Sequence, residues 1–134
     1  MDSPMLLKII LSFSIGVLIG FILEFSYRSV EAKRLVRPKI INVQMYGLTG
    51  ILLALIYSFK ISLMPTLVIL YIIPVLVEFI TGYTHLRIKG IRLWDYSKER
   101  FNFLGIICLR FSLAWFIISG FYYYLVLPKL EIMQ

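Results

Sequence analysis

The sequence predicts an all-α membrane protein with four transmembrane helices, and two observations support this fold class. The first is composition, because 60% of the 134 residues are hydrophobic and only 16% are charged. In a soluble domain, about a quarter of the residues are charged. The second is spacing, because four apolar segments approach the roughly 20 residues that a helix needs to cross a bilayer. These segments occupy most of the chain, so we expect one integral membrane domain covering residues 1–134.

The predicted spans follow one another with short connections, and they cover residues 5–26, 43–59, 63–83 and 103–127. No basic region precedes the first apolar segment, so it is interpreted as an uncleaved span rather than a signal peptide. The second span is near the minimum length for crossing. A tight turn joins it to the third, so these two spans are predicted to form an antiparallel hairpin.

Basic residues concentrate in two of the connections and predict the topology. The loops at residues 27–42 and 84–102 each carry five Lys or Arg, whereas the turn between the second and third spans carries only Lys60 and the C-terminal tail only Lys129. Basic loops stay on the cytoplasmic side, so both termini are predicted to face outward across the cell (inner) membrane. The same loops are expected to contact anionic lipids. Since topology accounts for the net charge of +7, no nucleic-acid partner is predicted.

Common catalytic and metal-binding signatures are missing from the sequence. The single Cys108 excludes an internal disulfide and a cysteine-rich metal site. No CxxC, HExxH, GxSxG, P-loop or GxGxxG pattern occurs. The sequence therefore predicts no catalytic residue, no metal site and no cofactor.

Small residues predict close helix packing in the first two spans. Gly16 and Gly20 form a GxxxG pair, and Gly47 and Gly50 lie at the start of the second span. Small residues four positions apart let two helix backbones approach closely. Two interpretations are open, packing within the four-helix bundle and homodimerisation.

Apart from Lys8 near the outer end of the first span, three charged residues lie within the predicted spans, namely Glu24, Glu78 and Arg110. An unpaired charge at the centre of a span costs about 2.5–3.5 kcal/mol on insertion scales, so we predict that the three cluster in the inner leaflet. Such a cluster has one carboxylate in excess, which calls for hydrogen bonds from residues such as Tyr46 or Thr81, or for a bound cation or proton. It could be a ligand site, or it could only fix the helix register.

The loop before the fourth span carries further candidates for ligand binding, Trp94, Asp95, Tyr96 and Ser97, with Asn102 following. If the loop folds back, its WDYS segment would form a lid over the charged cluster. The alternative is an Asp-initiated turn, with Asn102 capping the fourth helix.

These motifs resemble a known family. The segments EFITGY, LWDYS and FNFLGIICLR, together with SIGVLIGFILEFSY in the first span, are similar to the CmpB-like, or ABC-transporter type IV, family of small multi-pass membrane proteins. The resemblance covers nearly the whole chain and implies a four-span membrane protein. It departs where the second span begins, because only Tyr46 and Gly47 remain of a longer family pattern.

Three functions are compatible with the sequence. The leading hypothesis is a transport or permease-like component with a polar inner-leaflet site for a small solute or ion. Four spans are few for a transport path, so this hypothesis requires a homo-oligomer or a partner membrane subunit. The alternatives are an accessory subunit of a membrane complex and a membrane-embedded enzyme acting on lipid head groups, for which carboxylates could hold Mg²⁺.

Overall fold

A computed structural model describes residues 3–132. Its elements are α1 (Ser3–Ala32), α2 (Ile40–Ser58), α3 (Leu63–Lys89), a small hairpin of β1 (Asn102–Phe103) and β2 (Ile107–Cys108), and a last helical run of α4 (Leu109–Phe121), the π-helical η1 (Tyr122–Val126) and α5 (Leu127–Ile132). Within the described residues, four helices are long and apolar enough to cross a membrane, Ser3–Ala32, Ile40–Ser58, Leu63–Lys89 and Leu109–Glu131. The chain is therefore a multi-pass, mainly helical membrane protein.

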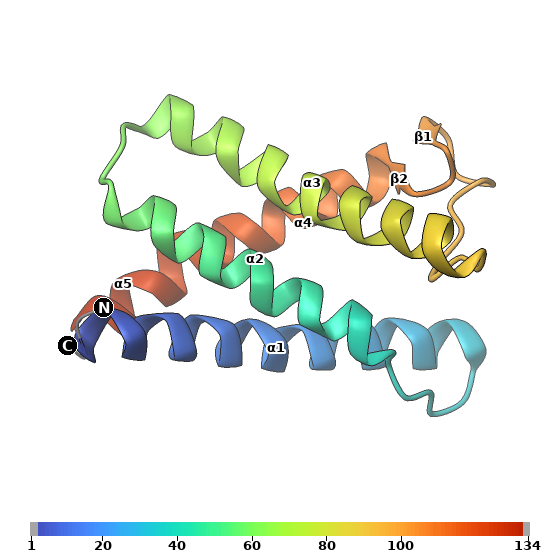
Figure 1. Cartoon of the computed structure of the whole chain (residues 1–134), viewed down its shortest axis with the longest axis horizontal. Helices are drawn as coiled ribbons and strands as arrows, with labels where there is room; N and C mark the ends of the chain where they lie inside the picture. The colour runs from blue at the N-terminus through green and yellow to red at the C-terminus, as the bar shows by residue number, and fades with distance from the viewer. Residues whose placement is uncertain (1–2, 133–134) are drawn as a thin grey trace.

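The four long helices run up and down, so the connections fall at two opposite ends (Figure 1). Residues 33–39 and 90–108 lie at one end, called the loop end below. The turn between α2 and α3 lies at the opposite end, with the start of α1 and with α5, and this is called the terminal end. Both basic loops therefore share one end of the bundle.

The fourth span begins later than predicted, and its predicted start at residue 103 is wrong. Phe101, Leu104 and Gly105 have φ values of 52°, 55° and 67°, which are left-handed and cannot continue an α-helix. Asn102 pairs with Cys108 in the hairpin, and helix α4 starts only at Leu109. The apolar composition of this segment suggested a helix, but three left-handed residues in one short stretch produce a turn.

Asn102 holds this hairpin and does not cap the fourth helix, which corrects that part of the prediction. Its side-chain amide donates a hydrogen bond to the carbonyl of Glu99 at 2.9 Å. Its Oδ1 accepts one from the backbone N–H of Gly105 at 3.0 Å. Both bonds are local, so the side chain stabilises the turn that delays α4.

Helices α1 and α3 extend beyond the predicted spans at the loop end. Helix α1 continues to Ala32, and α3 continues to Lys89 and ends where Gly90 adopts φ 68°. The Gly90 N–H donates to the carbonyl of Leu86, which satisfies one of the last carbonyls of the helix. The sequence-based boundaries stopped where charged residues begin, whereas the helices continue past the apolar core.

The glycines of α1 and α2 pack against each other's helix. A Cβ atom on Gly16 would lie 2.6 Å from the carbonyl oxygen of Tyr46, and one on Gly20 would overlap the Tyr46 side chain. Gly47 faces the Phe13 ring of α1, and Gly50 faces the Ser12 carbonyl oxygen. In the residues that the structure describes, the GxxxG pair packs within the bundle, which is the first of the two interpretations.

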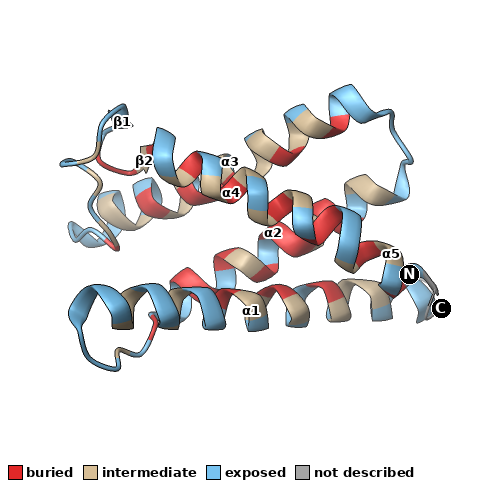
Figure 2. Ribbon diagram, turned by 180° about the vertical axis from the view of Figure 1, so that it is seen from behind, coloured by how far each residue is buried: buried red, intermediate tan, exposed pale blue. Residues whose placement is uncertain are grey.

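The remaining core lies at the terminal end, where α2, α3 and the last helical run meet. Leu53, Leu70 and Leu127 are fully buried there, with Tyr122 and Tyr123 around them. The Tyr122 hydroxyl donates to the backbone carbonyl of Ser12 at 2.9 Å. Buried residues follow the inward sides of the helices, and exposed residues, many of them apolar, follow the outer sides (Figure 2). An apolar outer surface is what a bilayer covers.

Candidate functional site

A cavity of about 450 Å³ lies at the loop end. Its walls come from α1, α2, α3 and α4 and from the loop that contains residues 93–99. Charged residues in its lining are Glu24, Arg28, Glu31, Glu78, Asp95 and Glu99, and aromatic residues are Tyr27, Tyr46, Trp94, Tyr96, Phe111 and Trp115. The cavity is large enough for a small solute.

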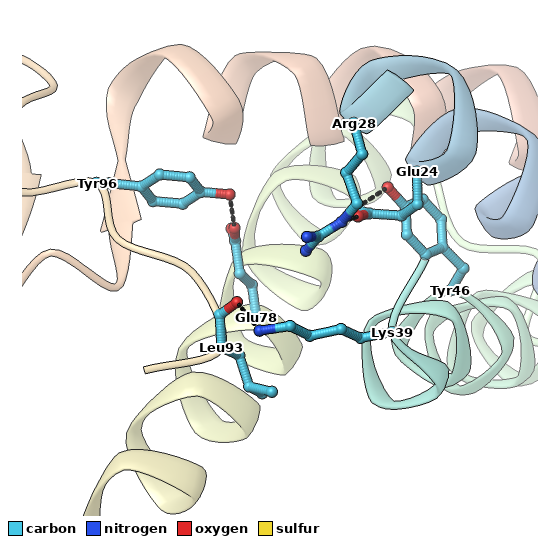
Figure 3. A network of polar contacts seen from close by, with 7 residues as sticks. All are labelled: Glu24, Arg28, Lys39, Tyr46, Glu78, Leu93 and Tyr96. Carbon is cyan, nitrogen blue, oxygen red and sulfur yellow. Dashed lines mark hydrogen bonds and ion pairs between the residues drawn. The ribbon is translucent and has the colours of Figure 1, made fainter. Parts of the chain in front are cut away.

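Glu78 is the most buried charged residue of this lining. It lies on α3 one turn after Pro74, and only 2% of its surface is exposed. Its Oε1 atom accepts a hydrogen bond from the Tyr96 hydroxyl at 2.9 Å (Figure 3). Its Oε2 atom has no hydrogen-bond partner at good distance and angle among the residues that the structure describes, and the Trp115 indole lies beside the carboxylate. Buried polar atoms are nearly always paired, so this oxygen is an open acceptor.

Asn42 adds a second open acceptor to the same cavity. It lies in the first turn of α2 and is 2% exposed. Its Oδ1 atom also has no partner within residues 3–132. Sequence reasoning missed this residue by treating it as the end of a loop. The available signal was its position four residues before Tyr46, which places both side chains on one helix face.

Glu24 is paired, unlike Glu78. The Nε atom of Arg28, one turn later on α1, lies 3.0 Å from its Oε2. The Tyr46 hydroxyl donates to its Oε1 at 3.2 Å (Figure 3). The Tyr46 ring packs on Trp115 at 4.6 Å between centroids. Arg28 was counted as a loop residue in the sequence, because α1 was expected to end at Ser26. The longer helix brings its guanidinium to the cavity.

The WDYS loop folds back over the cavity and is held there by its two aromatic residues. The Trp94 indole donates to the carbonyl of Ile106 at 2.8 Å and packs against Gly82 of α3, where a Cβ would lie 2.8 Å away. The Tyr96 ring stacks on Phe111 at 4.7 Å. Lys39 from the other basic loop donates to the carbonyl of Leu93 at 3.0 Å, which ties the two loops together (Figure 3).

The protonation states of this loop follow from its contacts. Burial, with the neighbouring Glu78 carboxylate, raises the pKa of Tyr96 far above its usual value, so the phenol remains a hydrogen-bond donor to Glu78. Asp95 accepts a hydrogen bond from the backbone N–H of Ser97 at 2.9 Å. Bonding to Ser97 lowers the pKa of Asp95, so this side chain is negatively charged at neutral pH.

The structure does not place Arg110 in the predicted charged cluster, and that part of the prediction is wrong. Because α4 begins at Leu109, Arg110 lies in its first turn rather than two turns inside a span. Its side chain is 68% exposed and pairs with Glu99 at 3.3 Å. Arg28 instead supplies the guanidinium next to Glu24.

Three further candidates also lie apart from the described cavity lining. Thr81 borders a shallow depression on another side of α3, with Thr84 and His85. Ser97 binds Asp95 through its backbone, and Asn102 holds the β-hairpin. The predicted residues that the structure brings together around the cavity are Glu24, Tyr46, Glu78, Trp94, Asp95 and Tyr96.

The chemistry of this lining suits recognition of a solute. It combines buried hydrogen-bond acceptors with aromatic walls and a paired carboxylate. Within residues 3–132, no group of three or more His, Cys, Asp or Glu side chains is arranged to hold a metal ion.

Fold and cavity together define a multi-pass integral membrane protein with a polar chamber between its helices. The sequence then places the chain in a family, because residues 11–134 match the family model described as "Putative ABC-transporter type IV". The chain belongs to this family, and the resemblance noted in the sequence is confirmed. No curated protein and no solved structure matches the chain.

Proposed function

We propose that the protein is a transport component that binds a small solute or ion in the loop-end cavity. The carrying observation is Glu78, a buried carboxylate with one oxygen paired to Tyr96 and the other without a partner among the described residues. Burying an unpaired charged group is unfavourable unless a partner is supplied. A bound solute supplies that partner, and the surrounding cavity of about 450 Å³ gives it room. The transporter-related family supports the same function.

The arrangement of the cavity suggests how transport would proceed. The positive-inside rule assigns the loop end to the cytoplasmic face of the cell membrane, so the solute enters or leaves the cavity on that side. Toward the terminal end lies a second, smaller gap of about 20 Å³, and Tyr46 and Trp115 line both this gap and the cavity. Separation of this aromatic pair would connect the cavity to the gap lined by Gly50 and Tyr122.

One chain of four helices gives few surfaces for alternating access, since transporters usually move one repeat or bundle against another. The proposal therefore includes a second copy of the chain or a partner membrane subunit. Such a partner would cover part of the apolar outer surface that a bilayer otherwise covers.

The test is the thermal stability of the purified protein with a panel of ions and small metabolites. A ligand should raise the melting temperature of the parent protein, because it binds the folded state only. It should not raise that of Glu78→Gln. The matched control is Glu131→Gln, since Glu131 pairs with Lys60 and belongs to helix α5, which lies at the terminal end of the bundle (Figure 1).

Two results would contradict the proposal. In the first, no compound stabilises the parent protein, and Glu78→Gln only changes its assembly with a membrane partner, which indicates an accessory subunit. In the second, a compound stabilises parent and Glu78→Gln equally, so the cavity is not where it binds. A separate measurement by mass spectrometry would identify an enzyme, if a lipid head group incubated with the protein is converted.

A further inference from the structure

The acidic residues of this basic protein are gathered around the cavity. The chain has seven Asp and Glu against 14 Lys and Arg. Five of those seven acidic residues line the cavity, whereas Arg28 is the one basic residue in its described lining. Two cations of the basic loops are bound to backbone carbonyls, Lys39 to that of Leu93 at the edge of the cavity and Arg92 to that of Leu104. Acidic residues therefore outnumber basic residues in the cavity lining, although the protein as a whole is basic.

The negative charges occur at two depths. Glu78 is deeply buried, and Glu24 is half-buried and neutralised by Arg28. Glu31, Asp95 and Glu99 are more exposed and belong to the longer helix α1 and to the WDYS loop, and of these Glu99 is paired with Arg110. Carboxylates around a concave opening concentrate counter-ions there and speed their association. Both depths favour a positively charged ligand.

Aromatic side chains form part of the cavity wall, together with the two open acceptors. Six aromatic side chains line it, and Tyr46, Trp115, Tyr96 and Phe111 form two packed pairs. Aromatic faces attract organic cations, and the attraction grows when the cation is desolvated. The unpartnered oxygen of Asn42, and that of Glu78 in its ionised form, accept hydrogen bonds or face a positive charge, and neither can then donate in return.

We propose that the ligand of this cavity is a small organic cation, an amine or a quaternary ammonium compound. Its charged group lies against Glu78 and Asn42, and the aromatic side chains surround its alkyl groups. A divalent metal ion fits the same residues less well, because such ions take six or more oxygen ligands and the described residues offer no metal-binding group. The inference rests on the proposed function and specifies its ligand.

Arg28 provides a sharp test of the sign of the ligand's charge. Its guanidinium extends from Glu24 toward the side of the cavity where Glu78 lies (Figure 3). A cationic ligand is repelled by this group, so Arg28→Gln should bind it more tightly. An anionic ligand would need the guanidinium as its partner, so Arg28→Gln would no longer bind an anionic ligand. The two ligand classes therefore predict opposite effects.

The experiment uses the full-length protein in lipid nanodiscs and measures binding by isothermal titration calorimetry. The probes are choline, its neutral isostere with carbon in place of nitrogen, tetramethylammonium, spermidine, magnesium ions and inorganic phosphate. We expect at least one organic cation to bind, and the neutral isostere to bind at least about tenfold more weakly than choline if choline is that cation. Glu78→Gln should lower the affinity for the cation by about tenfold or more, and Arg28→Gln should raise it by about threefold. Glu131→Gln should leave this affinity unchanged.

Each alternative outcome overturns the inference in a recognisable way. If the isostere binds as well as choline, or if phosphate binds and Arg28→Gln abolishes it, the cation inference fails and the proposed function survives. Binding of magnesium ions alone would also overturn the inference. If no compound in this panel or the stability panel binds, both the inference and the proposed function fail.

A second pair of variants keeps the test decisive if Glu78→Gln does not fold. Glu31→Gln and Asp95→Asn change exposed residues of the cavity lining. Their combination should weaken cation binding by about twofold or more and reduce its dependence on salt, because fewer charges attract the ligand. Unchanged binding and salt dependence would contradict a cationic ligand.

Discussion

The two ends of the helical bundle contrast in how they treat buried polar groups. At the terminal end, leucine and tyrosine side chains fill the space, and the Tyr122 hydroxyl bonds to a carbonyl of α1. At the loop end, the same helices surround a cavity of about 450 Å³. Of the three buried side-chain atoms without partners in the described residues, those of Asn42 and Glu78 line the cavity, and Ser12 Oγ lies on α1 nearer the terminal end.

This contrast indicates a division of work between the ends. Close packing at the terminal end holds the helices together. The loop end is packed less closely and contains a cavity with unpaired acceptors. Functional sites often reduce stability in this way. Substitutions at the terminal end should therefore change stability and leave binding intact, whereas substitutions at the loop end should change binding and have smaller effects on stability.

The largest effect is expected at the terminal end, with Leu70→Ala. Leu70 is fully buried in the core cluster, and truncating such a residue destabilises by about 2–5 kcal/mol because a cavity remains. Unfolding measured by denaturant or heat should show this loss, while the affinity for the ligand stays unchanged. The matched control is Leu76→Ala on the same helix, where the side chain is half exposed. Equal losses for both variants would refute the packing contrast.

The next effect concerns the contact between α1 and α2. Gly16→Ala places a Cβ 2.6 Å from the backbone carbonyl of Tyr46, which cannot move aside as a side chain would. We expect a loss of about 1–3 kcal/mol in unfolding experiments. Gly120→Ala is the control, because nothing lies within 4 Å of its added Cβ. If Gly16→Ala is as stable as the parent protein, the two helices are not in such close contact.

Tyr96→Phe should have an intermediate effect, on both stability and ligand affinity. It removes the hydroxyl that donates to Glu78 and leaves a second carboxylate oxygen unpaired, at a cost of about 1–3 kcal/mol. Because the phenol has a raised pKa and stays protonated, the loss should persist from neutral pH to pH 9. Stability measured across this range, together with ligand affinity, checks it. A loss that disappears toward pH 9 would show that the phenol ionises.

Glu78→Gln should act in the opposite direction on stability. The amide keeps an acceptor for Tyr96 and removes a buried charge, so the variant should be more stable by about 1 kcal/mol and should lose ligand binding. Thermal unfolding without ligand measures the first effect, and titration with ligand measures the second. Strong destabilisation with intact binding would show that Glu78 serves the fold alone.

The smallest effect belongs to Asp95. Its pKa is lowered by bonding to Ser97, so the charged form stabilises the lid loop at neutral pH. This contribution should be lost as the pH falls below the usual aspartate value of 3.8 and through the lowered pKa. The chemical shift of the Ser97 amide should titrate in that acid window in the parent and not in Asp95→Asn. A midpoint above the usual value would contradict the lowered pKa.

The sequence predicted the features that depend on composition and on regular helical spacing. Apolar segment lengths identified four membrane-crossing helices, and the intramembrane carboxylates pointed to Glu24 and Glu78 as cavity residues. The WDYS motif suggested a lid, and its loop does lie against Glu78 through Tyr96. Helical periodicity and the cost of buried charge are local properties, so a single sequence contains them.

The features that it could not predict depend on backbone turns and tertiary contacts. The left-handed residues around Leu104 shift the start of α4, and this shift moves Arg110 out of the cluster. The extension of α1 brings Arg28 to Glu24 instead. Asn42 became a candidate only when its Oδ1 proved to be unpaired and buried beside the cavity. None of these results follows from hydropathy.

The most direct test makes one chemical change at each end of the bundle and measures ligand affinity. Glu78→Gln alters the cavity, and Glu131→Gln makes the same change at the terminal end, where Glu131 pairs with Lys60. We predict that the solute that stabilises the parent protein binds Glu131→Gln with parental affinity and Glu78→Gln at least about tenfold more weakly. Equal affinity for both variants would contradict a binding site at the loop end.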